Sequence, residues 1–400
     1  MPPEAARPAS SGAEPGGGSP GPEPGGEPHG PEPGGGSPGP EPGGEPHGAG
    51  PGGGPPGTVH VVLPGDIDDP GTPSGGNSYD RRVCAGLAAA GWTVREHAVP
   101  GSWPHPTPPQ RAGLARLLAA LPDGASVLID GLVGSTVPEL LTPHARRLCP
   151  VLLVHMPLAD RAEAAALAAV AGVITTSGWT RQLLLRRHAL PADRVWVARP
   201  GVDPAPPAPG TAGGTRLLCV AAVTTHKGHD VLVDALAAVA DRDWRCTCVG
   251  ALTRDPDFVD LLRERIRRHG LADRVRLAGP RTGAALAAGY ADADLLVLAS
   301  RGETYGMVVP EALARGVPVL VSAAGGLAEA VGRAPDGTRP GLLVRPDDPA
   351  ALAGALRRWL DDAALRDRLR RCARARRDTL TGWPDTTRRV AAALHRAAGR

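Results

Sequence analysis

The stretch DLLVLASRGETYGMVVPEALARGVPVLVSA (294–323) contains the structural unit from which the fold can be predicted. It begins and ends with short apolar runs, DLLVLAS (294–300) and PVLVSA (318–323), which are typical of fully buried strands. Between them, EALARG (311–316) has the composition of a helix. A buried strand, a helix and another buried strand in this order predict a parallel βαβ unit.

The same alternation runs through most of the chain from Thr58 onwards. In its first part the predicted strands are 58–65, 125–131, 150–157, 172–177 and 194–203, and the predicted helices are 81–92, 138–148, 162–171 and 179–188. In its second part the predicted strands are 215–223, 244–251, 274–279, 294–300, 318–323 and 341–346, and the predicted helices are 229–240, 257–270, 283–293, 311–316 and 349–360. Strands that are apolar throughout predict parallel sheets with helices on both faces.

The predicted fold class is therefore α/β, with two Rossmann-like doubly wound domains that face each other across a cleft. Ligands are expected at the carboxyl ends of the strands. The predicted divisions are a tail (1–57), an N-terminal domain (58–203), a linker (204–214), a C-terminal domain (215–378) and a final helical segment (379–400). The tail repeats EPGGGSPGPEPGGEPHG at 14–30 and 32–48 and has almost nothing apolar to bury, so it is predicted to be disordered.

Composition excludes several classes of function. The formal net charge of +3 is too small to indicate a nucleic-acid partner, and no nucleic-acid-binding motif is present. The six cysteines form no CxxC pair, so they are predicted to be small buried hydrophobic residues in a reducing compartment. No apolar run is long enough to span a bilayer and no signal peptide is recognisable, which predicts a cytoplasmic protein.

Two glutamates eight positions apart, Glu303 and Glu311, are the strongest candidates for binding residues. Between them, Gly306 permits close approach of the backbone, and the amides near Met307 and Val308 precede a helix. Amides at a helix start attract a phosphate, while carboxylates on either side accept hydrogen bonds from sugar hydroxyls. The segment is thus suited to a sugar diphosphate, although an ordinary loop with acidic residues before a helix would have the same composition.

This segment resembles the Glu-x7-Glu motif of the family-4 (group 1) retaining glycosyltransferases, which have the two-domain GT-B fold. The resemblance implies a hexosyltransferase that uses an NDP-sugar donor and retains the anomeric configuration. It also implies that Glu303 contacts the transferred sugar and that Glu311 holds the nucleotide ribose. The N-terminal domain would then bind the acceptor, the C-terminal domain would bind the nucleotide sugar, and the helix within 379–400 would pack back on the N-terminal domain.

A second similar segment, LLCVAAVTTHKGHDVLVDALAAV (217–239), contains Lys227, the only lysine in the chain. The family places a lysine here on the donor diphosphate, whose growing charge an ammonium group stabilises in the transition state. The family often has an arginine five residues earlier, where this chain has Ala222. Either Lys227 acts alone, or another cation such as Arg281 or Arg301 replaces the missing arginine.

Two further positions in the N-terminal half resemble the family. Gly75 and Gly76 lie where a Gly-rich loop closes over the donor phosphates, and Asn77 and Ser78 beside them suit either a ligand contact or a helix cap. His155 ends a predicted strand, where the family commonly has a histidine on the transferred sugar, although a structural histidine is a serious alternative. Asp66, Asp68 and Asp69 imitate a metal-binding Asp-x-Asp, but they precede a Gly-rich loop, and neither a metal nor another cofactor is predicted.

The acceptor is not readable from the sequence and is either a small molecule or a lipid. The Arg-rich stretch RDRLRRCARARR (366–377) could contact an anionic membrane and place the protein at its periphery, but a solvated helix face is the simpler interpretation. A phosphorylase or epimerase of the same fold, or a non-catalytic protein that binds sugar nucleotides, are the alternative functions.

Overall fold

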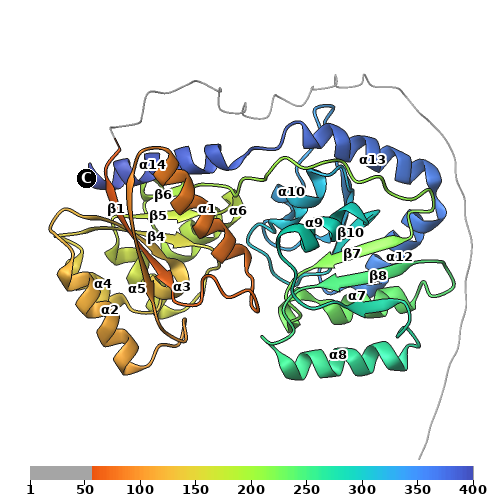
Figure 1. Cartoon of the computed structure of the whole chain (residues 1–400), viewed down its shortest axis with the longest axis horizontal. Helices are drawn as coiled ribbons and strands as arrows, with labels where there is room; N and C mark the ends of the chain where they lie inside the picture. Colours follow the sequence, from red (N-terminus) through yellow and green to blue (C-terminus); the bar gives the residue numbers. More distant parts are fainter. Residues whose placement is uncertain (1–55, 400) are drawn as a thin grey trace, which may run out of the picture. The chain divides into compact units, whose positions relative to one another are not determined.

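The computed structural model describes residues 56–399, which contain two parallel six-stranded sheets (Figure 1). The predicted tail lies almost entirely outside these residues. The first sheet has the order β2-β1-β3-β4-β5-β6 and consists of β1 (Thr58–Pro64), β2 (Thr93–Val99), β3 (Ser126–Asp130), β4 (Cys149–Val154), β5 (Gly172–Thr175) and β6 (Val195–Val197). The second has the order β12-β11-β10-β7-β8-β9 and consists of β7 (Arg216–Val220), β8 (Arg245–Val249), β9 (Val275–Leu277), β10 (Leu295–Leu298), β11 (Val319–Ser322) and β12 (Gly341–Val344).

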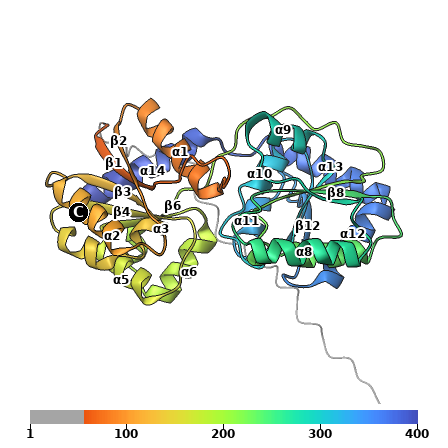
Figure 2. The same cartoon turned by 60° about the horizontal axis from the view of Figure 1, so that its bottom comes forward.

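Helices connect the strands of each sheet, as parallel pairing requires. The first group is α1 (Gly75–Ala89), α2 (Pro108–Ala120), α3 (Gly131–Gly134), α4 (Pro138–Leu141), α5 (Arg161–Ala169) and α6 (Gly178–His188). The second is α7 (His229–Ala237), α8 (Pro256–Arg268), α9 (Gly283–Ala291), α10 (Val308–Leu313) and α11 (Leu327–Val331). After the last strand follow α12 (Pro349–Asp361), α13 (Ala363–Arg377) and α14 (Trp383–Ala398). In Figure 2, α8 and α12 lie on one side of the second sheet and α9 and α10 on the other. The predicted α/β fold class is confirmed.

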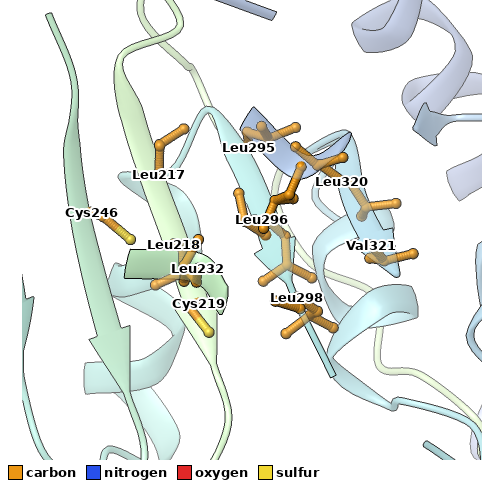
Figure 3. Close-up of a cluster of buried hydrophobic side chains, with 14 of the residues drawn as sticks. Leu217, Leu218, Cys219, Leu232, Cys246, Leu295, Leu296, Leu298, Leu320 and Val321 are labelled. Carbon is orange, nitrogen blue, oxygen red and sulfur yellow. The ribbon is translucent and has the colours of Figure 1, made fainter. Parts of the chain in front are cut away.

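Leucine, valine and cysteine side chains form the core of the second sheet (Figure 3). Five of the six cysteines are buried, which confirms their prediction as small apolar residues; Cys149 alone is half-buried. Two tryptophans, Trp244 and Trp359, supply the largest fully buried side chains, and each indole N–H donates to a backbone carbonyl. The small aromatic content is thus concentrated where a large side chain with a satisfied polar atom stabilises the core most.

The first sheet is covered on both faces by separate hydrophobic clusters. One contains residues of α2 and α5, and the other combines residues of β1 and α1 with the last helix of the chain. The apolar face of α14, including Val390 and Leu394, packs beside α1 against this first sheet (Figure 1). None of the helices within residues 56–399 is both long and apolar enough to cross a membrane.

Several predicted elements differ from the observed ones. The strand β2 and the helix α2 were not predicted. β2 is a mostly exposed edge strand of mixed polarity, so its sequence contains no apolar run. The helix predicted at 138–148 is only α4 followed by a 3-10 turn (Thr142–His144), since Pro143 cannot donate the hydrogen bond that would continue it. The strand predicted at 194–203 is confined to β6, which ends before Pro200 and Gly201.

Each sheet has one point where the strand order reverses, and this defines where ligands bind in such folds. In the second sheet β7 pairs with both β8 and β10, so the reversal lies between β7 and β10. In the first sheet β1 pairs with both β2 and β3, so the reversal lies between β1 and β3. The loops after these four strands are therefore the places to look for functional side chains.

Candidate functional site

The loops after β7 and β10 bring two predicted residues together. Lys227 ends the short 3-10 turn after β7, Glu303 lies in the loop after β10, and the lysine Nζ is 2.5 Å from Glu303 Oε2. Both side chains are largely covered, with 20% and 17% of their surfaces exposed. A half-buried ion pair at a strand-order reversal brings a cation for phosphate and an acceptor for hydroxyl groups to one place.

The backbone next to Lys227 requires a glycine. Gly228 has a φ of +67°, and a side chain there would lie 2.1 Å from the carbonyl oxygen of Ala299, at the end of β10. The turn after β7 therefore packs directly against the start of the loop that carries Glu303. The backbone amide of Arg301 adds a hydrogen bond of 2.8 Å to the carbonyl of His226. These contacts fix the turn that carries Lys227 against the loop that carries Glu303.

Glu311 lies in the first turn of α10, as predicted. Its Oε2 accepts a hydrogen bond of 2.7 Å from the hydroxyl of Tyr290, and the Arg315 guanidinium stacks 4.8 Å from the centre of the same ring. Burial raises the pKa of Glu311, and the Tyr290 hydroxyl and Arg315 partly counteract that rise. Tyr290 was not singled out from the sequence, because only its neighbourhood in space connects it to Glu311.

The other residues predicted between the two glutamates lie at the start of α10. Gly306 has a φ of +85°, Met307 caps the helix, and Val308 is its first residue. Met307 packs against the core of the second sheet and also against the cluster that contains β1 and α1. A side chain on Gly75 would meet the Met307 sulfur at 3.5 Å, so the two predicted glycine-containing segments are near neighbours.

The two candidate replacements for the missing arginine differ. The guanidinium of Arg301 binds Asp230 at 2.7 and 3.0 Å and Asp347 at 2.9 Å, so carboxylates already compensate its charge. Arg281 follows β9 and is half-buried, and no carboxylate within residues 56–399 pairs with it. Of the two, Arg281 keeps its charge available for a ligand.

At the reversal in the first sheet, the two glycines that were predicted to form a loop instead form the first turn of α1, beside His155. Gly75 and Gly76 begin α1, and Ser74 caps this helix by accepting a hydrogen bond of 3.0 Å from the Asn77 amide, so the cap is neither Asn77 nor Ser78. A side chain on Gly76 would lie 3.3 Å from the His155 ring. The glycine therefore leaves the ring edge uncovered.

His155 is bound by two buried acids that the sequence analysis did not identify. Its Nε2 lies 2.7 Å from Asp80 Oδ1 and 3.6 Å from Asp130 Oδ2. Burial alone would lower the pKa of His155, but the two carboxyl groups raise it above its ordinary value. Burial, together with the Asp80 charge, raises the pKa of Asp130 to about 8. Both acids could have been found from the sequence, because Asp130 ends a predicted buried strand and Asp80 closely follows Gly75 and Gly76.

The acidic loop after β1 is engaged by its own surroundings. Asp68 accepts from the Arg81 Nε at 2.7 Å, while Asp69 accepts from the Gly71 amide at 2.8 Å and the Thr72 hydroxyl at 2.7 Å. Within residues 56–399, two other sets of side chains are close enough to share an ion, Cys219, His229 and Cys248 in one and Asp80, Asp130 and His155 in the other. Spacing alone does not make either set a metal centre, and the metal-free site remains a prediction.

The class of fold is shown by comparison with solved structures. The chain superposes on a glycosyltransferase from Rickettsia africae (TM-score 0.65, 20% identity, 84% of this chain and 96% of that one). It also superposes on a sucrose-phosphate synthase from Thermosynechococcus elongatus (TM-score 0.67, 24% identity, 83% and 97%) and on Anabaena HepE in complex with UDP and glucose (0.64, 19%, 84% and 98%). The two sheets thus form a GT-B fold, as predicted.

Comparison by sequence finds a family resemblance over part of the chain. Residues 214–362 match the family model described as "Glycosyl transferases group 1". Similar curated proteins include the D-inositol 3-phosphate glycosyltransferases of Streptomyces avermitilis (36% identical over 234 residues, 54% of this chain and 49% of that one) and Kineococcus radiotolerans (35% over 251 residues, 56% and 57%). The chain spans about half the length of the curated relatives it matches. The similarity to the group 1 glycosyltransferases thus covers residues 214–362, which is less than half of the chain.

Proposed function

We propose that this protein transfers a hexose from an NDP-sugar to an acceptor hydroxyl with retention of the anomeric configuration. The observation that carries the proposal is the Lys227–Glu303 ion pair at the reversal point of the second sheet, within the segment that matches the group 1 glycosyltransferase model. The ammonium group is placed to bind an anionic diphosphate, and the carboxylate is placed to accept hydrogen bonds from a sugar. When the donor binds, its diphosphate becomes a second partner for Lys227 and frees part of the Glu303 carboxylate for the hexose.

The leaving diphosphate is the group that needs most stabilisation, because negative charge develops on it as the glycosidic bond breaks. Lys227, Arg281 and the backbone amides near Met307 and Val308 supply positive charge or donors, and the start of α1 at Gly75 and Gly76 admits the phosphates closely. No side chain is assigned as a covalent nucleophile. Retention then follows from attack on the face that the diphosphate leaves, with a phosphate oxygen accepting the proton of the acceptor hydroxyl.

The Glu311 carboxylate is proposed to hold the ribose hydroxyls, and this role predicts an effect of Tyr290. The hydrogen bond from Tyr290 lowers the pKa of Glu311, so Tyr290→Phe should raise it and leave less carboxylate at acidic pH. We expect the KM for the donor to rise more steeply below pH 6 in this variant, with a smaller change above pH 7. Donor KM values across this pH range check the prediction, and a KM ratio of variant to wild type that is independent of pH contradicts the ribose role.

The acceptor is proposed to be a small hydroxylated molecule. The relatives named above act on D-inositol 3-phosphate, which makes a phosphorylated polyol the first acceptor to test. The basic stretch 366–377 gives little support to a lipid acceptor, because several of its arginines bind the protein itself. Arg366, Arg370, Arg376 and Arg377 donate to backbone carbonyl oxygens within the fold.

The direct test is thermal stabilisation of the purified protein by UDP-, GDP-, ADP- and TDP-sugars. A donor at about 100 times its Kd should stabilise the folded protein by about 2.7 kcal/mol, and one nucleotide series should do so more than the others. The shift and the subsequent transfer should survive EDTA, because cationic side chains rather than a metal bind the diphosphate. Stabilisation without transfer to any acceptor would indicate a non-catalytic binding protein, and transfer from a sugar phosphate would indicate a phosphorylase. No shift with any donor rejects the proposal.

A further inference from the structure

Three buried side chains meet at the reversal point of the first sheet. Asp80 extends from α1, Asp130 ends β3, and His155 follows β4. Only 2% of Asp80 and 3% of Asp130 are exposed, and 14% of the His155 side chain. The family resemblance implies that His155 contacts the transferred sugar, but it gives no reason for two carboxyl groups behind the ring. A single carboxylate would be enough to orient an imidazole ring.

The hydrogen bonds of this cluster indicate how many protons it holds. Asp80 Oδ1 is bound to His155, whereas the buried Oδ2 has no partner if both acids are ionised. One carboxyl oxygen of Asp130, one of Asp80 and a ring nitrogen of His155 all lie within 4.8 Å of one another, and a hydrogen bond between the two acids requires a proton on one of them. A proton held between the two acids supplies a donor for the Asp80 carboxyl, whose buried oxygens should be hydrogen-bonded, as buried polar atoms almost always are.

The charges agree with this count. An imidazolium, a carboxylate and a protonated carboxyl add up to zero net charge. Two ionised acids would leave a net charge of −1 beside an imidazolium and −2 beside a neutral ring, and uncompensated buried charge is costly. The neighbouring titratable groups do not change the sum. Burial raises the pKa of Cys84 to about 12 and that of Tyr79 well above its ordinary value, so both remain neutral over the pH range of interest.

We propose that Asp80 and Asp130 share one proton and together fix the His155 ring with its Nε2–H donated to Asp80. The two acids are then positioning residues, and Nδ1 is the ring nitrogen left for a substrate oxygen on the side that Gly76 keeps uncovered. This inference rests on the proposed function and deepens it, because it assigns the protonation state and orientation of the histidine that the family resemblance places on the transferred sugar.

The ligand-free protein labelled with 15N-histidine tests the inference by NMR, with His155→Gln used to assign the His155 signals. We expect the wild-type ring to titrate above the ordinary value of about 6.5 and to show a hydrogen-bonded Nε2–H. Asp80→Asn should lower the pKa of His155 and weaken that hydrogen-bond signature, because a neutral amide oxygen is a weaker acceptor than a carboxylate. Asp130→Asn should keep the signature. Asp69→Asn, which changes an exposed acid of the neighbouring loop, is the matched control and should change neither.

Unfolding of the wild-type protein and of Asp130→Asn at several pH values provides a second test. The pKa of Asp130 is raised to about 8 in the folded protein, against about 3.9 when unfolded. Its stabilising contribution is therefore complete below pH 4 and is lost as the pH rises towards 8. The asparagine cannot titrate, so Asp130→Asn should become steadily more stable relative to wild type between pH 5 and pH 8.

These results are separable from the proposed function, since neither measurement needs a donor or an acceptor. If His155 titrates identically in wild type and Asp80→Asn, the positioning role is wrong. If the stability difference between wild type and Asp130→Asn is independent of pH, the shared proton is wrong. If both tests succeed but no transfer is found, the cluster stands and the glycosyltransferase assignment fails. If transfer is found, Asp130→Asn should also remove a step near pH 8 from the kcat profile.

Discussion

Replacing Lys227 with methionine is expected to lower kcat/KM for the nucleotide-sugar donor by about 10²–10³-fold, the usual cost of removing one group that stabilises developing negative charge. The substitution keeps the length and most of the packing of a side chain that is only 20% exposed, so the protein should still fold. It also leaves the Glu303 carboxylate without the cation that lies 2.5 Å away. Steady-state kinetics with the donor identified by thermal stabilisation check the prediction.

Controls separate the loss of this ammonium from a general loss of charge. Arg345→Met removes a cation whose side chain is 86% exposed on the same half of the molecule, and it should leave kcat/KM within about two-fold of wild type. Because Lys227 and Glu303 contact each other, the effects of Lys227→Met and Glu303→Gln should not add in the double variant. Wild-type turnover by Lys227→Met would remove the lysine from the mechanism, and fully additive effects would mean that the pair does not act as a unit.

The residues of the site that could be predicted from the sequence were predictable for one physical reason. Glu303 and Lys227 follow apolar strands in short loops, and short loops after neighbouring parallel strands must end at the same edge of a sheet. A recognisable motif therefore also located the residues in space. The spacing to Glu311 was predictable for the same reason, since only a loop and the first turn of α10 separate it from Glu303.

The residues that were missed depend on contacts between distant segments. Tyr290 reaches Glu311 from α9, and Asp80 reaches Asp130 from α1, and neither contact leaves a periodic pattern in the chain. The strand β2 was missed because an edge strand with an exposed face needs no apolar run. Ser74, and not Asn77, caps α1 because the helix begins at Gly75. Composition does not determine where a helix begins, so the cap could not be predicted.

Gly325→Ala is expected to reduce transfer by about 10²-fold while lowering stability, because the loop that contains Gly325 supports the backbone of Glu303. Gly325 has a φ of +56°, and a methyl group there would lie 1.9 Å from the carbonyl oxygen of Glu303. The adjacent Gly326 amide donates a hydrogen bond of 2.8 Å to that same oxygen. The alanine can be accommodated only if the Glu303 segment moves, and a displacement of about 1 Å at a catalytic group costs roughly 10²-fold in rate.

Gly337→Ala is the matched control. Gly337 also has a positive φ, +79°, but nothing lies within 4 Å of the position that its methyl group would take. Both variants incur the cost of a left-handed residue, about 1–2 kcal/mol, whereas only Gly325→Ala adds the clash with Glu303, which typically costs a further 1–3 kcal/mol. Urea unfolding midpoints and kcat/KM should therefore separate the two. Equal losses of activity in both would show that stability, rather than the position of Glu303, limits transfer, because the control changes the backbone without touching the site.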